Sequence, residues 1–231
     1  MRVPVPGSAA TAISRLPAVT GPLEADEGPP RRPPPGGLLG IFGGTFDPPH
    51  IAHVVAACWA RQALGLHEVW FVPAHRPWQK VGDRPVTAAA DRLAMCRAAA
   101  RDVPGLHVST IEVDRGGNSY TADTLAELDA VDPTGRRFLI VGGDAAAGLP
   151  TWERVEEVRR RCTLVVVDRP GIPSADPPGG WPHERVTIPR LDVSSTELRA
   201  RVAAGLPIDG LVPPGVRSVI DERGLYRGPL L

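Results

Sequence analysis

A chain of 231 residues in which 26 basic side chains balance 26 acidic ones has a formal net charge of zero and a sequence pI of about 7.0. This balance gives no electrostatic preference for nucleic acid or for an anionic membrane, so we expect neither as a partner. The length suffices for one sizeable α/β domain, and no apolar run reaches the length of a transmembrane helix.

Cysteine usage favours a reduced compartment. Cys58, Cys96 and Cys162 are far apart and form no C-x-x-C pair, which fits a cytoplasmic protein better than a disulfide framework or a zinc site. The N-terminal region is no convincing signal peptide, because Arg15 interrupts its only weakly apolar stretch. We therefore expect a cytoplasmic protein.

The first 36 residues are rich in Pro, Gly and Ala. This composition predicts a disordered or polyproline-like tail at 1–36. A docking segment for a proline-recognising partner is the alternative, and a solvated tail is the simpler interpretation. The folded domain is expected at 37–231.

Apolar runs and helical patterns alternate through the rest of the chain. Thr87 is expected to cap a helix that carries Leu93 and Cys96, and another helix turns Ala122, Leu125 and Leu128 inward. Strands are expected at 38–42, 69–72, 108–113, 136–144, 163–167 and 185–188; the remaining helices are expected from near residue 50 to residue 65, at 151–160, from about 194, and within 212–226. This alternation predicts an α/β fold, a doubly wound, Rossmann-like parallel sheet with helices on both faces.

The stretch from Gly43 to His53 combines a strand, a glycine turn and a helix N-terminus. Free backbone N–H groups and the helix dipole favour an anion at such a place. Thr45 adds a hydroxyl group. His50 and His53 share one helix face, from which two imidazoles can donate hydrogen bonds to oxygens where negative charge develops.

Other interpretations of this stretch exist. The turn alone is compatible with a plain connection, and the two histidines with a surface accident or half of a zinc site. The stretch lacks the H-E-x-x-H of zinc proteases, the Gly-Lys-Ser/Thr of a P-loop and the G-x-G-x-x-G of dinucleotide-binding enzymes.

A second candidate for phosphate binding runs from Ser194 to Arg199. Ser194 and Glu197 form a capping box, Ser195 and Thr196 add hydroxyl groups, and Arg199 adds a cationic fork one turn on. An ordinary capped helix with an exposed arginine is the alternative.

Together the two stretches resemble a known superfamily. GGTFDPPHIAH at 43–53 is similar to the GxFDPxHxGH signature, and Val193–Arg199 to the ISSTxxR signature, of nucleotidyltransferases. Four further stretches resemble bacterial nicotinate-nucleotide adenylyltransferases: SYTADTL at 119–125, GGD followed by a tryptophan at 142–152, RPG at 169–171 and GLYR at 224–227. PWQK at 77–80 is similar to the actinobacterial substrate loop, and the resemblance covers 38–227.

The resemblance implies transfer of AMP from ATP to nicotinate mononucleotide, giving nicotinate adenine dinucleotide (deamido-NAD) and pyrophosphate in NAD biosynthesis. Mg²⁺ would accompany ATP, with no protein side chain assigned as its ligand. The family's functional residues map onto three sets: catalytic, His50, His53 and Arg199; ATP-binding, Gly43, Gly44, Thr45, Phe46, Asp144, Ser194, Ser195 and Thr196; mononucleotide-binding, Lys80, Ser119, Tyr120, Thr121 and Trp152.

Some of these roles have structural alternatives. Trp152 would stack on the pyridine ring or serve as a core aromatic, and Tyr120 and Thr121 would meet the nicotinate carboxylate or cap a helix. Asp144 would contact the ribose of ATP.

Ala52 replaces the glycine of the family pattern, where its methyl group would crowd the nucleotide. The competing functions are a sibling enzyme that uses nicotinamide mononucleotide or another phosphate acceptor, and a nucleotide-binding module with weakened catalysis. A homo-oligomer is compatible with the sequence, which does not determine the oligomeric state.

Overall fold

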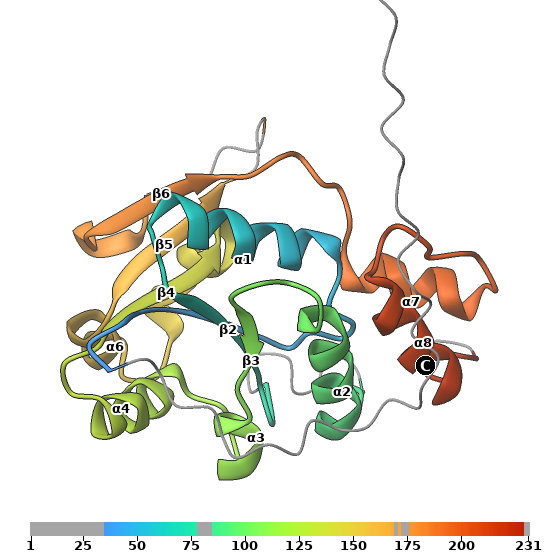
Figure 1. Ribbon diagram of the computed structural model, residues 1–231, viewed down its shortest axis with the longest axis horizontal. Helices are drawn as coiled ribbons and strands as arrows, with labels where there is room; N and C mark the ends of the chain where they lie inside the picture. Colours follow the sequence, from blue (N-terminus) through green and yellow to red (C-terminus); the bar gives the residue numbers. More distant parts are fainter. Residues whose placement is uncertain (1–34, 78–84, 169–170, 172–175, 229–231) are drawn as a thin grey trace, which may run out of the picture.

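A single parallel sheet organises the computed structural model, which describes residues 35–77, 85–168, 171 and 176–228. Neighbouring strands pair in parallel throughout, in the order β3-β2-β1-β4-β5-β6 (Figure 1). The strand order reverses between β1 and β4, which confirms the predicted doubly wound sheet. The strands are β1 (Leu38–Gly44), β2 (Glu68–Pro73), β3 (Leu106–Val108), β4 (Arg136–Gly142), β5 (Thr163–Asp168) and β6 (His183–Thr187).

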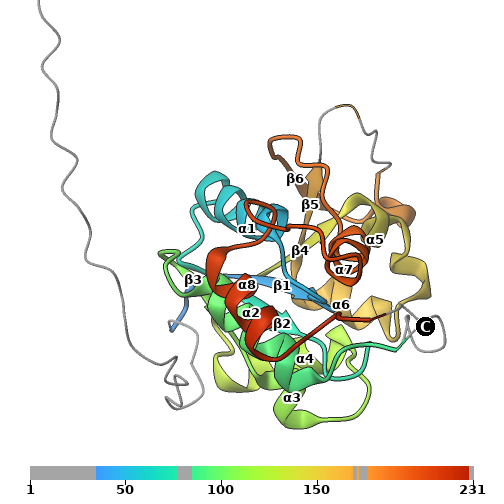
Figure 2. The same ribbon diagram turned by 90° about the vertical axis from the view of Figure 1, so that its right-hand side faces the viewer.

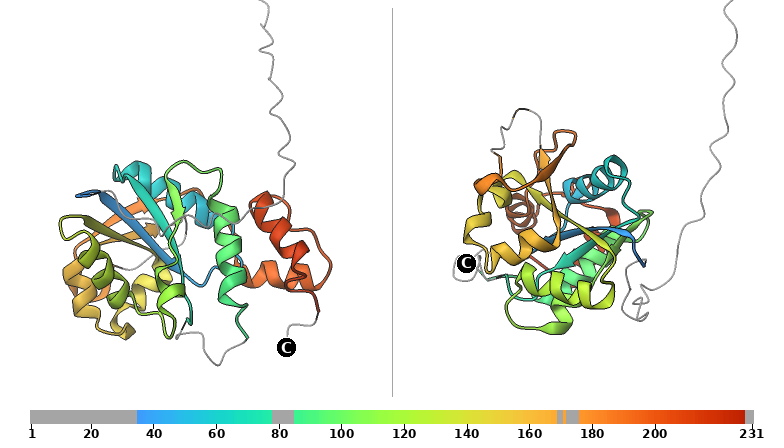
Figure 3. Two further views of the ribbon diagram at one scale, coloured as in Figure 1. Left: turned by 60° about the horizontal axis from the view of Figure 1, so that its bottom comes forward. Right: turned by 90° about the vertical axis from the view of Figure 1, so that its left-hand side faces the viewer.

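Helices cover both faces of this sheet. Helices α1 and α2 pack on one face and α4 and α6 on the other; in Figure 1, α1 lies above β2 and α4 below it, and Figures 2 and 3 show α8 beside α2. Short 3₁₀ turns lie at Leu149–Thr151 and Pro178–Gly180. The helices are α1 (Ile51–Ala63), α2 (Ala89–Ala100), α3 (Ile111–Arg115), α4 (Thr121–Val131), α5 (Gly143–Ala147), α6 (Val155–Arg161), α7 (Ser195–Ala203) and α8 (Pro214–Glu222).

The strands β1, β2, β4 and β5 are largely apolar on both faces, and their alternate residues contribute to two separate cores. In β2, Val69 and Phe71 pack with α1 and α2, whereas Trp70 and Val72 pack with α4. Such two-sided burial is typical of a parallel sheet covered on both sides. Gly40 in β1 permits close packing of the Val69 side chain, since a Cβ at this position would lie 2.8 Å from Cγ2 of Val69.

One predicted strand is wrong over nearly its whole length. Of the expected strand 108–113 only Val108 lies in β3 (Leu106–Val108), and Ile111–Arg115 forms α3 instead. Thr110 accounts for the change: its hydroxyl group donates to Asp114 Oδ2 at 2.5 Å, and its carbonyl accepts the N–H of Asp114 at 2.8 Å. Local hydrogen bonds of this kind compete with strand pairing.

Two helix starts also differ from the prediction. Thr87 does not cap α2, because Ala88 holds the N-cap position and the Thr87 carbonyl accepts a hydrogen bond from Arg92 Nε at 2.8 Å. The helix expected at 151–160 begins at Val155, because Arg154 adopts a left-handed conformation with φ 50°. On α1 the buried residues include Val54, Ala57 and Ala60, whereas Ile51, Val55 and Cys58 are only partly buried.

The predicted tail lies almost wholly outside the described residues, at 1–34. Gly36 belongs to the folded part, because its N–H donates to Asp132 Oδ2 at 3.1 Å. Within the described ranges, no helix combines the length and apolar character needed to cross a membrane.

Candidate active site

Two cavities meet at the carboxyl ends of β1 and β4, where the strand order reverses. Their volumes are about 610 Å³ and 300 Å³. Phe42, Gly44, Thr45 and Gly142 line both, so a ligand in one cavity can reach a ligand in the other. Ligands of open α/β sheets bind at this kind of switch point.

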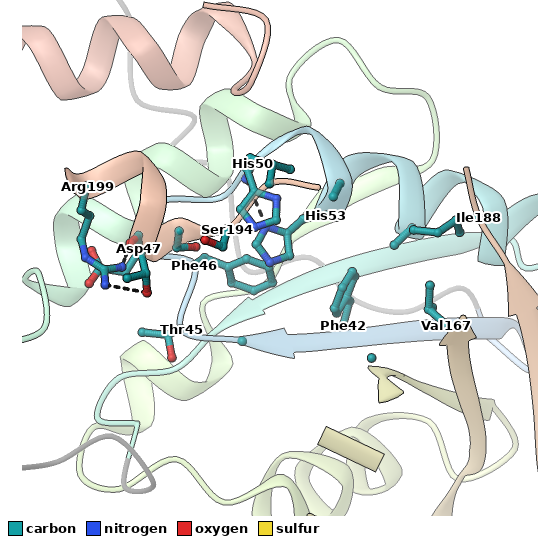
Figure 4. A pocket seen from close by; sticks show the side chains of 17 residues that line it. Phe42, Thr45, Phe46, Asp47, His50, His53, Val167, Ile188, Ser194 and Arg199 are labelled. Atoms are coloured by element: carbon teal, nitrogen blue, oxygen red, sulfur yellow. Dashed lines mark hydrogen bonds between the residues drawn. The ribbon is translucent and has the colours of Figure 1, made fainter. Parts of the chain in front are cut away.

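The first cavity has a polar end and an apolar end. In Figure 4, Asp47 and Arg199 lie at one end, Val167 and Ile188 at the other, and His53 between them. The polar end suits phosphate groups and the apolar end suits a flat base. The lining comprises Phe42, Gly44, Thr45, Phe46, Asp47, His50, Ala52, His53, Ala56, Gly142, Val167, Ile188, Val193, Ser194, Ser195, Thr196 and Arg199.

The predicted glycine turn is wrong in its position. Strand β1 continues through Gly43 and Gly44, which pair with Val72 and Pro73 of β2. The residue with positive φ is Phe46, at 50°, so the sharp turn follows the glycines. Gly43 lines the second cavity only, whereas Gly44 lines both. The glycines thus keep the strand's end open instead of bending it.

The ring of Phe46 packs against the ring of His53. The Phe46 ring is buried and lies 4.8 Å from that of Phe71 and 5.1 Å from that of His53, measured between centroids. Although Phe46 lines the first cavity as predicted for an ATP-binding residue, most of its surface packs against protein. This packing holds the left-handed turn in place.

His50 and His53 come together as the sequence predicts. His50 is the N-cap of α1, and its ring stacks on that of His53 with centroids 3.7 Å apart. The backbone N–H of His50 donates to Nδ1 of His53 at 3.1 Å. A neutral His53 must therefore carry its proton on Nε2, where it is a hydrogen-bond donor.

Helix α7 docks onto the first motif through two carbonyl groups. Ser195 Oγ donates to the Pro48 carbonyl at 2.8 Å, and Arg199 Nη1 donates to the Asp47 carbonyl at 2.7 Å. Arg199 is only 4 % exposed, so the alternative of an exposed arginine is wrong. Its second terminal nitrogen donates to Thr196 Oγ1 at 3.1 Å.

The capping interaction predicted for this helix is present. Ser194 Oγ accepts the N–H of Glu197 at 3.2 Å, as the capping box requires on that side. Ser194, Ser195 and Thr196 all line the first cavity beside Arg199. The two predicted phosphate-binding segments therefore face one space.

The second cavity brings together Ser119, Tyr120, Thr121 and Trp152. Ser119 Oγ accepts the backbone N–H of His75 at 2.9 Å, which ties the end of β2 to the segment before α4. Tyr120 occupies the N-cap position of α4 without a capping side-chain bond. Trp152 packs partly against the core and partly lines the cavity, and its stacking on the pyridine ring stays a prediction.

One predicted residue is not brought into either cavity, and another lies outside the described residues. Asp144 lies exposed in the first turn of α5 and lines neither space, so its contact with ribose stays a prediction. Lys80 lies outside the described residues, and its assignment stays a prediction as well.

Buried polar residues that the sequence does not single out support both cavities. Arg92 is 1 % exposed and donates to the carbonyls of Thr45 and His75, both at 2.9 Å, besides that of Thr87. Buried arginine is rare, so a helical Arg is ordinarily assigned to the surface. Nothing local in the sequence would have indicated its position.

Glu112 is the second residue of this kind. Its carboxyl group lines the second cavity, accepts from Thr124 Oγ1 at 2.7 Å, and is withdrawn from solvent. Burial raises the pKa of Glu112, against the hydrogen bonds from Thr124 and Ser119. The incorrect prediction of a strand at 108–113 prevented the assignment of Glu112 to the site, because a strand would have oriented its side chain differently.

The arrangement offers cationic and hydroxyl donors on one side of β1 and an aromatic ring with a helix N-terminus on the other. Within the ranges that the structure describes, no group of three or more His, Cys, Asp or Glu residues is placed to hold a metal ion. The geometry thus suits an anionic ligand in the first cavity and a ring-bearing ligand in the second, with the two meeting at the shared wall.

The chain matches known proteins over most of its length. The family described as cytidylyltransferase-like matches residues 41–201. A probable nicotinate-nucleotide adenylyltransferase of Streptomyces coelicolor is 47 % identical over 190 residues, covering 81 % of this chain and 100 % of that protein. One of the same description from Geobacillus thermodenitrificans is 42 % identical over 190 residues, covering 82 % of this chain and 86 % of the other.

A solved structure shares the fold. The nicotinic acid mononucleotide adenylyltransferase of Plasmodium falciparum, complexed with NaAD, superposes with a TM-score of 0.68 at 19 % identity. The match covers 82 % of this chain and 97 % of that one. At this identity the likeness shows the fold alone.

Proposed function

We infer that this chain transfers AMP from ATP to nicotinate mononucleotide, releasing pyrophosphate and forming nicotinate adenine dinucleotide. The chain belongs to the cytidylyltransferase-like family and, within it, to the nicotinate-nucleotide adenylyltransferases. The product is the precursor of NAD.

The observation that carries this function is the meeting of two unlike cavities at one shared wall. The triphosphate would lie at the polar end of the first cavity, near His50 and Arg199, with adenosine toward Val167 and Ile188. The mononucleotide would lie in the second cavity, with its ring near Trp152. The reacting phosphates then meet beside Gly44 and Gly142, which have no side chains to separate them.

The mechanism requires positioning and charge stabilisation more than proton transfer. The phosphate of the mononucleotide is already an anionic nucleophile and attacks the α-phosphorus of ATP in line, displacing pyrophosphate. The Nε2–H of His53 would donate to an oxygen of the α-phosphate, with His50 beside it. Arg199, Ser194 and Thr196 would hold the departing pyrophosphate.

We propose that ATP enters as its magnesium complex. Mg²⁺ is ordinarily held by substrate phosphates with few protein ligands, which fits a cavity without a clustered set of ligating side chains among the residues described. The proposed compartment is the cytoplasm, because the reaction consumes ATP and Cys58, Cys96 and Cys162 are free thiols.

A pyrophosphate-release assay tests the function. Purified protein receives Mg²⁺-ATP with nicotinate mononucleotide, nicotinamide mononucleotide or phosphopantetheine in separate reactions, and the dinucleotide is identified by mass. Release with nicotinate mononucleotide far above the other two supports the proposal. Preferential release with another acceptor would replace the substrate, and no release with any acceptor would refute the transferase function.

A further inference from the structure

The last turn of the described chain places a side chain against Asp47, a residue that lines the first cavity. Tyr226 follows α8 in a left-handed conformation, with φ 61°. Its hydroxyl group donates to Oδ1 of Asp47 at 2.7 Å, across 179 residues of sequence. Neither of the two phosphate-binding segments contains this tyrosine.

Asp47 is the residue on which these segments converge. Its side chain is buried and lines the first cavity, while its backbone carbonyl accepts the hydrogen bond from Arg199. The next carbonyl, that of Pro48, accepts from Ser195. Any movement of the Asp47–Pro48 turn therefore moves the docking point of α7 and the guanidinium group with it.

The tyrosine hydroxyl group is well suited to hold this turn. A buried carboxylate needs hydrogen-bond donors, and the bond from Tyr226 is short, whereas the backbone N–H of Thr87 lies 3.5 Å from Oδ2. Burial and the negative charge of Asp47 both raise the pKa of Tyr226, so the phenol keeps its proton and remains a donor at neutral pH.

We propose that Tyr226 is a positioning residue for ATP. Through Asp47 it fixes the distance between the Asp47–Pro48 turn and α7, and hence the position in which the triphosphate binds. The proposal rests on the function inferred above in assigning ATP to the first cavity. The second cavity includes none of these groups, so binding of the mononucleotide should be insensitive to them.

The test is Tyr226→Phe, which keeps the ring and removes only the hydroxyl group. Calorimetry with Mg²⁺-ATP alone should give a Kd about tenfold higher than for the wild type, on the scale of a lost hydrogen bond to a buried charge. In steady state, KM for ATP should rise by a similar factor while KM for nicotinate mononucleotide stays within about twofold.

Val219→Ala is the matched control, because it removes methyl groups from the same helix region without touching Asp47. It should lower the melting temperature and leave both KM values unchanged. In a double-mutant cycle, Asp47→Asn and Tyr226→Phe should be non-additive in the Kd for ATP, since both act on one hydrogen bond.

Three outcomes would overturn the proposal. They are an unchanged Kd for ATP in Tyr226→Phe, an equal rise of both KM values, and a rise in KM for ATP in Val219→Ala. The calorimetric arm needs no turnover, so wild-type protein that binds ATP without converting nicotinate mononucleotide refutes the function separately from the role of Tyr226.

Discussion

Replacing Arg92 by methionine should cost a large share of the protein's stability. The guanidinium group is buried and donates to the carbonyls of Thr45, His75 and Thr87 at 2.9, 2.9 and 2.8 Å. These carbonyls belong to the segments that follow β1, follow β2 and precede α2. One side chain thus braces three segments at the rim of the cavities.

The magnitude follows from what methionine leaves behind. The three carbonyl groups are partly buried, so each one that loses its donor costs about 1–3 kcal/mol, and release of a buried cation offsets part of the sum. We expect a net loss of about 4 kcal/mol, a large fraction of the roughly 5–15 kcal/mol that holds a typical domain. For a chain of this size that corresponds to a melting temperature lower by about 8–16 °C.

Urea and thermal unfolding followed by circular dichroism measure this loss. Arg97→Met, at a half-buried position on the same helix, is the control and should change stability by less than about 0.5 kcal/mol. Arg92→Met within about 1 kcal/mol of the wild type would show that the three carbonyls do not depend on Arg92, and the reasoning from buried hydrogen bonds would fail.

Three further changes probe the site. His50→Ala should lower kcat about a hundredfold or more at a nearly unchanged melting temperature, because the ring lines the cavity; near-normal turnover would contradict its role. Gly142→Val should fold, since φ −76° and ψ 163° suit valine and no atom lies within 4 Å of the added Cβ. The valine side chain should still abolish turnover, because it would occupy the space where the two cavities meet. An active variant would show that the two substrates do not meet beside Gly142. Burial raises the pKa of Glu112, so its neutral form stabilises the fold below about pH 4.5 and that contribution is lost as pH rises through the raised pKa. Urea titrations should therefore show the wild type losing stability relative to Glu112→Gln with rising pH, and a pH-independent difference would contradict this.

Local patterns were enough to predict most of the fold. The β-branched run Thr163–Val167 predicts a buried strand because nothing in its neighbourhood competes with sheet pairing, and the structure confirms it as β5. The prediction failed at 108–113, where the Thr110 side chain closes a helical turn onto Asp114. That competition depends on a side-chain hydrogen bond, which hydrophobic periodicity does not register.

The candidate site divides in the same way. His50, His53 and Arg199 belong to compact motifs, so the sequence alone brings them forward. Tyr226 and Arg92 act through contacts 179 and 47 residues away, respectively, and only the folded chain shows which groups they meet. Sequence motifs therefore predict the side chains that line a cavity better than the side chains that hold it in shape.

The hydrogen bond between Tyr226 and Asp47 has a consequence for how the molecule is made. Asp47 leaves the ribosome 179 residues before its partner, which at about 5–20 residues per second is a delay of roughly 10–35 s. The first nucleotide motif emerges at the start of that interval and the second only near its end, and Asp47 lacks its tyrosine donor until both have emerged. The nascent chain should therefore acquire its full affinity for ATP only after Tyr226 has emerged and bonded to Asp47.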